Sequence, residues 1–297
     1  MKKELRITDT LPKIKSKLGV TNFELANLLG ISERSVNYYL GQEQTKISDE
    51  IFNKITKLIE NKNLDLFDLF DLDDGNYLFH ASREGIVGKI TTTKNKEKAR
   101  DFDYGFYLSE SFKVAATYVD DEEKPHIYRF LKKDVLVGNR YLFEDNLEGR
   151  INWVLFIGLS RKKIVEITDK NFLSEYFNEL FENKDLLIGK IADSFNFDVM
   201  DDFFDQTYDI NQVSNALRMV DIGNQYVLKN EEYANKLNYI DDFTLDSKLK
   251  GYIYNWHIKQ NASIKKSNKN LLDKDKKDDN LTFGEVLKTL KEKYEQD

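Results

Sequence analysis

Apolar side chains recur at helical spacing along residues 11–70, which predicts a series of short helices. The first of these helices covers residues 11–18 and is followed by Gly19, a residue type that commonly ends helices. Thr21 and Glu24 stand three residues apart at the start of the next apolar stretch, which is the spacing of a capping box. The pattern therefore predicts an all-α bundle at the beginning of the chain.

From residue 76 the pattern changes to short runs of aromatic and β-branched residues, which are typical of strands. Gly105 directly precedes one of these runs, where the lack of a side chain lets another part of the chain approach closely. Helical spacing returns between the runs, so this part is expected to be an α+β domain with a split β-sheet and flanking helices. The expected strands are 77–80, 105–108, 127–131, 135–137, 186–188 and 225–228, and the expected helices are 111–119, 151–159, 171–183 and 211–220.

The last part of the chain changes character twice. Residues 261–280 are rich in Lys, Asn and Asp without apolar periodicity, which predicts a disordered linker. A small amphipathic helix is expected after it and is expected to dock on its own domain. The expected organisation is a helical domain at 1–72, the α+β domain at 75–245, its terminal helix at 246–260, the linker at 261–280 and a C-terminal helix at 281–297.

Composition narrows the classes of function. The 297 residues are 40% hydrophobic and 33% charged, with no cysteine and only three histidines, so a soluble protein without a metal site is expected. No apolar run approaches the ~20 residues of a spanning helix. No signal peptide is recognisable either, so a cytoplasmic location without membrane contact is expected. The absence of a glycine-rich phosphate loop and of a Gly-x-Gly-x-x-Gly turn excludes ordinary P-loop and Rossmann proteins.

Residues 21–41 resemble the helix-turn-helix of the phage-repressor-like family, with small, glycine, cap and apolar residues at the positions that this motif requires. The resemblance implies DNA binding. The alternative is a dimerisation or partner-docking bundle that has lost DNA binding, because residues 1–63 hold eleven Lys or Arg against eight Asp or Glu and the whole chain has a net charge of −7. The residues that would face DNA are Ser32, Arg34, Ser35 and Asn37, beside Glu33.

Three separated pieces of the α+β domain carry the candidate chemistry. They are residues 79–82 (Phe-His-Ala-Ser), residues 105–118 with two tyrosines, and residues 224–228 (Asn-Gln-Tyr-Val-Leu). In this order they resemble the poly(ADP-ribose) polymerase and diphtheria-toxin branch of the ADP-ribosyltransferases. The surrounding residues 101–102, 153–161 and 188–193 are similar to those of an uncharacterised bacterial family of that fold, and the resemblance spans roughly residues 76–240.

The resemblance implies a site for NAD as cosubstrate. His80 would hydrogen-bond the ribose hydroxyls, and Ala81 replaces a glycine whose backbone pairs with the nicotinamide amide. Tyr107 and Tyr118 would stack on the two faces of the nicotinamide ring, whereas Ala115 replaces a serine that binds nicotinamide. The implied catalytic residues are His80, Tyr107 and Gln225, and the implied cofactor-binding residues are His80, Ala81, Ser82, Arg83, Tyr107 and Tyr118, with Ser82 on the ribose and Arg83 on the pyrophosphate.

Gln225 departs from the family pattern, because the polymerases have a glutamate at this position. A glutamine can hydrogen-bond the ribose, but it is neutral and cannot act as a general base. The departure argues against chain elongation and leaves the transfer of single ADP-ribose units. Glu110, Asp193 and Glu231 are alternative carboxylates, and Asp101 is expected to line the slot.

The sequence thus predicts a mono-ADP-ribosyltransferase that moves ADP-ribose from NAD to a protein or nucleic acid. A toxin or anti-phage effector, with a neutralising antitoxin as a partner, is a natural role in this family context. The alternative is a non-enzymatic DNA-binding transcription regulator whose second domain senses NAD or a related nucleotide. Taken singly, the histidine and the two tyrosines are also compatible with purely structural roles.

Overall fold

The chain folds into two compact units in a computed structural model. The first unit comprises Met1–Gly85, Glu110–Lys132 and Tyr239–Ile258, and the second comprises Ile86–Ser109, Lys133–Asn238 and Lys259–Asp297. Both contain helices and strands, so the expected α+β class is confirmed. The structure describes residues 2–41, 46–73, 75–93, 100–119, 125–161, 170–192, 198–218, 223–268 and 281–294, with side chains left out for 260–268.

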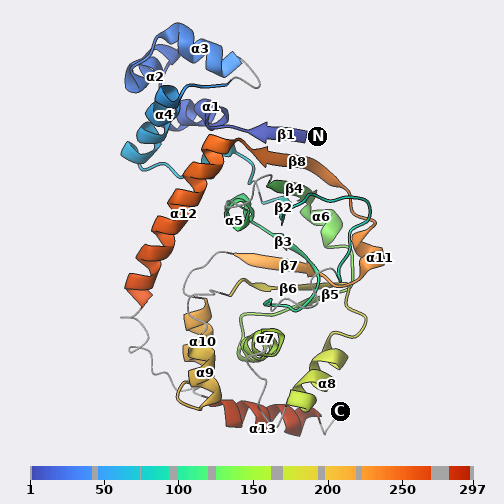
Figure 1. Cartoon of the computed structure of the whole chain (residues 1–297). Helices are drawn as coiled ribbons and strands as arrows, with labels where there is room; N and C mark the ends of the chain where they lie inside the picture. The colour runs from blue at the N-terminus through green and yellow to red at the C-terminus, as the bar shows by residue number, and fades with distance from the viewer. Residues whose placement is uncertain are drawn as a thin grey trace. The chain divides into compact units, whose positions relative to one another are not determined.

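Four strands of the first unit lie side by side (Figure 1). The first pair is parallel and the other two pairs are antiparallel. Phe79, Ile127 and Phe243 point to one face of these strands and are fully buried there. In spatial order the strands are β1 (Lys2–Leu5), β8 (Tyr239–Leu245), β4 (His126–Leu131) and β2 (Tyr77–Ser82).

The first N-terminal helix ends, and the second begins, where the sequence predicts. Gly19 ends the first of them in the left-handed conformation with φ +64°. The Thr21 hydroxyl accepts the Glu24 N–H at 3.2 Å, and the Glu24 carboxylate accepts the Thr21 N–H at 2.7 Å, so the capping box is confirmed. The helical elements of the first unit are η1 (Ile7–Thr10), α1 (Leu11–Leu18), α2 (Asn22–Leu29), α3 (Glu33–Gly41), α4 (Asp49–Asn61), η2 (Asp68–Phe70), α5 (Phe112–Tyr118) and the start of α12 (Ser247–Asn268).

Phe112, the first residue of α5, joins the helices to the strands in one core. Its ring centroid lies 5.8 Å from that of Phe79 on β2 and 6.4 Å from that of Phe243 on β8. It also lies 6.3 Å from that of Phe67, which follows the N-terminal helices. The boundary expected at residues 73–75 therefore lies inside the first unit, whose core is continuous across it.

The second unit is organised around α7 (Leu147–Ser160), which is apolar on nearly all sides and almost completely buried. In Figure 1 this helix lies between the strands and the C-terminal helix α13 (Phe283–Tyr294). The strands follow the order β3 (Phe106–Ser109), β7 (Asn224–Leu228), β6 (Leu186–Lys190) and β5 (Arg140–Leu142). The other helices are α6 (Lys132–Val135), α8 (Lys170–Leu180), α9 (Val199–Phe204), α10 (Ile210–Leu217) and α11 (Glu231–Ala234).

The C-terminal helix α13 docks on its own unit, as predicted. Phe283 lies 5.5 Å from Phe203 and 5.1 Å from Phe204, measured between ring centroids. At the other end of the helix, the ring of Tyr294 lies 5.6 Å from that of Phe172 on α8. Aromatic contacts at both ends therefore fix α13 to α8 and α9.

The strand expected at residues 135–137 is wrong. Val135 instead ends the short helix α6, and Val137 is 79% exposed. The Tyr233 hydroxyl lies 2.9 Å from the carbonyl oxygen of Asp134 and 3.0 Å from that of Val135, and it accepts the Gly138 N–H at 2.9 Å. The β-branched residues Val135 and Val137 favour a strand. The hydrogen bonds of Tyr233, which is distant in the sequence, hold a turn there instead.

The chain end also differs from the expectation. The helix α12 continues to Asn268, past the end expected at residue 260, so residues 261–268 are helical rather than part of a linker. The rest of the expected linker, residues 269–280, lies outside the described residues.

Gly105 sits where a side chain cannot fit. Its φ is +155°, and a Cβ atom there would lie 2.3 Å from Cγ1 of Val227 and 3.0 Å from the carbonyl oxygen of Leu228. We expect Gly105→Ala to lower the free energy of unfolding by about 3 kcal/mol through overpacking and backbone strain. Gly251 in α12 is the matched control, because nothing lies within 4 Å of the added Cβ. Urea unfolding should show a small gain of about 0.5 kcal/mol for Gly251→Ala; equal losses would contradict the close approach at Gly105.

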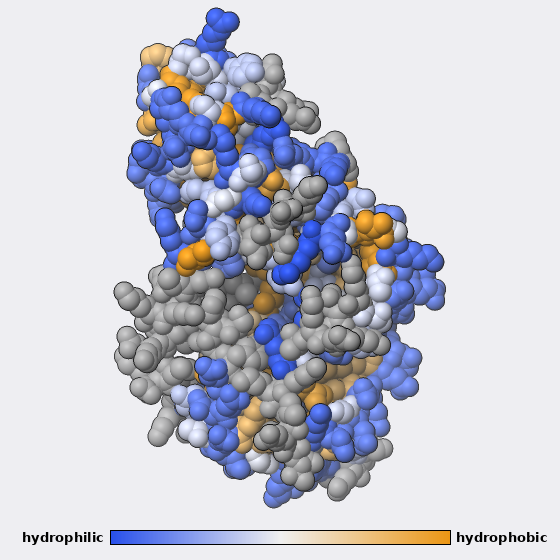
Figure 2. Space-filling view, in the orientation of Figure 1, coloured by the Kyte–Doolittle hydropathy of each residue, from blue (hydrophilic) through white to orange (hydrophobic). Residues whose placement is uncertain are grey.

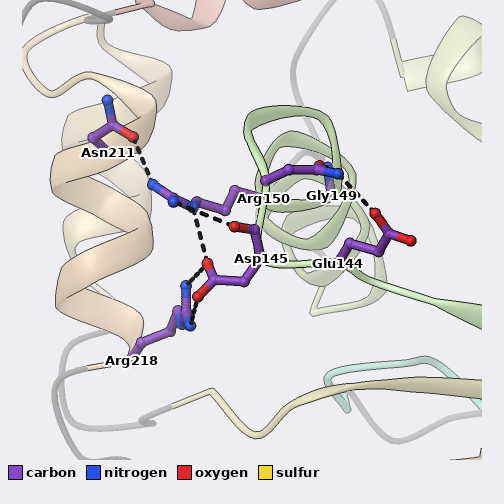
Figure 3. A network of polar contacts seen from close by, with 7 residues as sticks. Glu144, Asp145, Gly149, Arg150, Asn211 and Arg218 are labelled. Atoms are coloured by element: carbon purple, nitrogen blue, oxygen red, sulfur yellow. Dashed lines mark hydrogen bonds and ion pairs between the residues drawn. The ribbon is translucent and has the colours of Figure 1, made fainter.

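Asp145 joins the start of α7 to the end of α10 at the surface (Figure 3). Its carboxylate accepts from Arg218 at 2.7 and 3.1 Å and from Nε of Arg150 at 3.1 Å. These guanidinium groups, Arg218 first, lower the pKa of Asp145 to about 2. A carboxyl group whose pKa is lower in the folded than in the unfolded protein stabilises the fold at pH values above its unfolded-state pKa. This contribution is lost as the pH falls through about 2. Because the Asp145 side chain is 65% exposed, the contribution is small.

Candidate functional site

A buried carboxylate, that of Asp101, collects four hydrogen bonds in the second unit. Its Oδ1 accepts from Nε of Arg161 at 2.8 Å and from Nη2 of the same guanidinium. Its Oδ2 accepts the Ala192 N–H and Nε2 of Gln225, each at 3.0 Å. Asp101 is 5% exposed, so the donors replace water around the charge. Asp101 therefore anchors the end of α7, the end of β6 and the side chain of Gln225, and it does not line an open slot.

The network fixes which way the Gln225 amide points. Its Nε2 donates to Asp101 and, at 3.2 Å, to the carbonyl oxygen of Lys190. Both partners are acceptors, so they assign the nitrogen to this side of the amide. No described residue donates a hydrogen bond to Oε1 of Gln225. Gln225 is 5% exposed, as is Asp101. Of its two polar atoms, Oε1 is the one left for a hydroxyl that binds directly against this side chain.

The loop before β3 is held by side chains on both sides of it. The Tyr107 hydroxyl donates to the carbonyl oxygen of Asp103 at 2.5 Å and accepts the Phe102 N–H at 3.2 Å. The Lys229 ammonium donates to the carbonyl oxygens of Phe102 at 3.0 Å and Tyr104 at 2.6 Å. Asp103 itself has a φ of +58°, in the left-handed region. These contacts fix the conformation of the loop, and with it the position of Asp101 next to the Gln225 amide.

Tyr107 is a positioning residue in this arrangement. Burial, and after it the negative charge of Asp101, raises the pKa of Tyr107. The hydroxyl therefore stays neutral and keeps its place in the loop. The Arg100 guanidinium carbon lies 5.3 Å from the centroid of the Tyr107 ring, so a cation covers one face of this ring.

His80 lies in a row of flat rings in the first unit. Its ring is stacked toward Tyr128 at a centroid distance of 6.4 Å and an interplanar angle of 29°. The Tyr128 ring is in turn nearly parallel to that of His126, at 5.9 Å and 8°. Nδ1 of His126 lies 2.8 Å from Oδ1 of Asp242. The row crosses β2, β4 and β8 on the face opposite to Phe79.

The structure separates the expected NAD residues by unit. His80, Ala81, Ser82, Arg83 and Tyr118 belong to the first unit. Arg83 is exposed, Tyr118 is 45% exposed at the end of α5, and Ala81 packs against the core on the face opposite to His80.

Tyr107 and Gln225 belong to the second unit, where they share one face of the paired strands β3 and β7. Ser109 is the residue directly opposite Gln225. This pair of strands is thus the place where the structure brings two of the expected residues together.

The alternative carboxylates are engaged elsewhere. Glu110 accepts from the Lys132 ammonium at 2.7 Å. Glu231 accepts the Thr92 N–H at 3.3 Å at the start of α11. Asp193 lies outside the described residues. Neither described carboxylate therefore takes over the position of a glutamate at residue 225.

The expected DNA-facing residues lie on and just before α3. Ser32 caps this helix, because its hydroxyl accepts the Ser35 N–H at 3.1 Å. Arg34 is exposed, and the exposed Asn37 accepts from the side chain of Asn22 at 2.6 Å.

Apolar surface also appears over the N-terminal helices in Figure 2. Phe23 is 59% exposed and Tyr38 is 49% exposed. The surface of α2 and α3 is therefore both polar and apolar, and its single arginine, Arg34, directly follows Glu33 in the chain.

A comparison with protein families decides the relationship of the chain. Residues 77–239, more than half of it, match the family described as "Protein of unknown function (DUF3990)". The chain belongs to this family. No curated protein and no solved structure matches it. The DUF3990 segment contains the whole Asp101 network and His80, Tyr128 and His126, whereas Asp242 lies just beyond its end. Its span agrees with the extent expected from the sequence.

Sequence reasoning missed four residues of these two clusters. They are Arg161, Tyr128, His126 and Asp242. Only Tyr128 lies inside an element that the sequence predicts, the strand at 127–131, and no local pattern pairs any of the four. In the described part of the chain, no helix is long and apolar enough to cross a membrane, and no group of three or more His, Cys, Asp or Glu could hold a metal ion.

Proposed function

We propose that the chain is an NAD-dependent mono-ADP-ribosyltransferase that transfers ADP-ribose to a protein or nucleic acid. The observation that carries the proposal is the orientation of Gln225. Its amide nitrogen is bound to Asp101 and Lys190, which leaves Oε1 as an acceptor on β7. In the resembling enzymes, a glutamate oxygen at this position accepts the hydrogen bond of the ribose 2′-OH. An oriented amide oxygen can accept the same hydrogen bond.

The negative charge that a glutamate would carry at residue 225 is instead on Asp101, the hydrogen-bond partner of Gln225. A hydrogen bond from Nε2 to a carboxylate polarises the amide and increases the negative charge on Oε1. This oxygen then stabilises the positive charge that develops on the ribose as its bond to nicotinamide breaks. The stabilisation is weaker than that of a full carboxylate, so a slow transfer of single units is the expected activity.

The remaining roles follow from the resemblance and from exposure. His80 is assigned the ribose hydroxyls, Ser82 the same ribose and Arg83 the pyrophosphate. Tyr118, with its ring 45% exposed, is assigned the stacking contact with nicotinamide. Tyr107 positions the loop that carries Asp101. A toxin or anti-phage effector remains the proposed context, with the N-terminal helices as the surface for a neutralising partner or DNA.

The proposal predicts that His80→Ala lowers the rate of nicotinamide release from NAD. The lost hydrogen bonds to the ribose should cost about tenfold to a hundredfold. His257 on α12 provides the control, because it lies on another element of the same unit. Nicotinamide should be quantified with purified wild type, His80→Ala and His257→Ala in the presence of a bacterial lysate. If His80→Ala keeps the wild-type rate, the NAD site does not include His80.

One observation favours the second candidate, a non-enzymatic DNA-binding transcription regulator that senses NAD. Arg34 and Asn37 stand exposed on the helix that would read a groove. The two acidic residues of α2 and α3, Glu24 and Glu33, weaken the case for phosphate binding. Binding of NAD without nicotinamide release, together with specific binding of DNA, would favour the regulator over the transferase.

A further inference from the structure

The face of the first-unit strands that carries His80 is apolar at one end, where Leu78 and Phe130 are fully buried, and polar at the other end. Phe79, Ile127 and Phe243 fill the core on one side. On the other side, the alternation of β2, β4 and β8 brings His80, Ser82, His126, Tyr128 and Asp242 together. Core packing does not require these five polar side chains, so their part of the face is a candidate for chemistry.

His126 is oriented by Asp242. The 2.8 Å contact joins Nδ1 to the carboxylate, so Nδ1 carries the proton that is donated, and in the neutral imidazole Nε2 has the free lone pair. The tautomer is assigned from this partner. In the described part of the chain, no residue forms a hydrogen bond with Nε2 of His126. The side chains of His126 and Asp242 are 17% and 13% exposed, so solvent or a bound molecule can reach them.

The surroundings of His126 keep the ring in place. Tyr128 is nearly parallel to it, and the Tyr128 hydroxyl lies 3.5 Å from Nδ1. Gly85, with φ +81°, turns the chain against this pair, where an added Cβ would lie 3.1 Å from the Tyr128 hydroxyl and 3.5 Å from Nε2 of His126. Ser82 is the residue of β2 opposite His126. The imidazole is therefore fixed on three sides, with Nε2 directed away from its carboxylate.

The transfer reaction needs a group that accepts a proton. Gln225 cannot take one, and the carboxylates of Glu110 and Glu231 are engaged by Lys132 and Thr92. An acceptor hydroxyl must lose its proton as it attacks the ribose. His126 lies diagonally across one strand pair from His80. The Tyr128 ring stacks with both imidazoles, so His80 and His126 belong to one continuous surface of these strands.

We propose that His126, held by Asp242, is the general base of the transfer, an inference that rests on the proposed transferase function. The acceptor oxygen forms a bond with C1′ of the ribose, and its proton passes to Nε2 of His126. The bond between C1′ and the nicotinamide nitrogen breaks, and its electron pair leaves with neutral nicotinamide. Asp242 is a positioning residue that stabilises the imidazolium formed in this step.

The test compares His126→Gln and Asp242→Asn with wild type and with His257→Gln. Transfer of labelled ADP-ribose to a lysate, kcat and KM for NAD, and the Kd for NAD are measured. His126→Gln should lower kcat for transfer by about a hundredfold or more while the Kd for NAD stays unchanged. Asp242→Asn should lower kcat by about tenfold at unchanged Kd, because the base remains but its orientation is weakened. His257→Gln should behave as wild type.

Chemical rescue separates catalysis from a structural role. Added imidazole should restore part of the transfer by His126→Ala and should not affect wild type. If His126 and Asp242 only hold β4 and β8 together, their variants should have lower melting temperatures and should lose kcat and NAD binding equally. Imidazole should then give no rescue. Wild-type transfer by His126→Gln overturns the inference and leaves the transferase function standing. Absence of nicotinamide release by the wild type overturns both.

Discussion

Asp101→Ala is expected to destabilise the protein by about 3 kcal/mol, among the largest effects of any single substitution in the second unit. The substitution leaves the Arg161 guanidinium, the Ala192 N–H and the Gln225 amide without their shared acceptor. Arg161 is 25% exposed, so water compensates only part of the loss. Urea unfolding followed by the fluorescence of Trp153, which is buried on α7, measures the effect.

The matched control is Asp145→Ala. Asp145 accepts hydrogen bonds from two guanidinium groups, those of Arg218 and Arg150, whereas Asp101 accepts from one (Figure 3). Its side chain is 65% exposed, whereas that of Asp101 is 5% exposed, so we expect a loss of about 1 kcal/mol or less. Equal effects of the two substitutions would contradict the role of Asp101 as a buried anchor.

Gln225→Glu is expected to destabilise the protein by about 2–4 kcal/mol at neutral pH, although it restores the residue of the resembling enzymes. The introduced carboxyl would replace the Nε2 donor and face the Asp101 carboxylate at hydrogen-bond distance. Two carboxylates so close share one proton, which raises the folded-state pKa of the introduced carboxyl above its unfolded value. The loss of stability relative to wild type should therefore be smallest below about pH 4 and grow as the pH rises through the folded-state pKa.

The double substitution Asp101→Asn with Gln225→Glu tests the same idea in reverse. It moves the single negative charge from residue 101 to residue 225 and restores a donor between the two side chains. Thermal unfolding at neutral pH should show the double variant to be more stable than Gln225→Glu alone. Additive losses would contradict the view that one charge is shared between these positions.

The local features of the fold could be predicted from the sequence, because their determinants are close together in the chain. The capping box of Thr21 and Glu24 and the helix end at Gly19 each depend on neighbouring residues. The strand expected at residues 135–137 failed because Tyr233, far along the chain, binds the backbone there. Pattern alone cannot anticipate a contact of that kind.

The candidate site could be predicted only in part. The resemblance indicates His80 and Gln225, and the structure adds the partners that orient them. Asp101 and Arg161 are 60 residues apart, and His126 and Asp242 are 116 residues apart. Nothing in the spacing of these residues indicates their contact. Tyr107 was predicted as a wall of the slot on the basis of its ring, whereas its hydroxyl binds the loop backbone.

The central claim is that the chain cleaves NAD and passes ADP-ribose to a macromolecule. The most direct measurement supplies purified wild-type protein and a bacterial lysate with NAD labelled in its adenosine moiety. Label in the macromolecular fraction and free nicotinamide are then quantified in the same samples. We predict equal amounts of both, rising together with time. NAD that binds without nicotinamide release, or nicotinamide that appears without label on any macromolecule, would contradict the transferase.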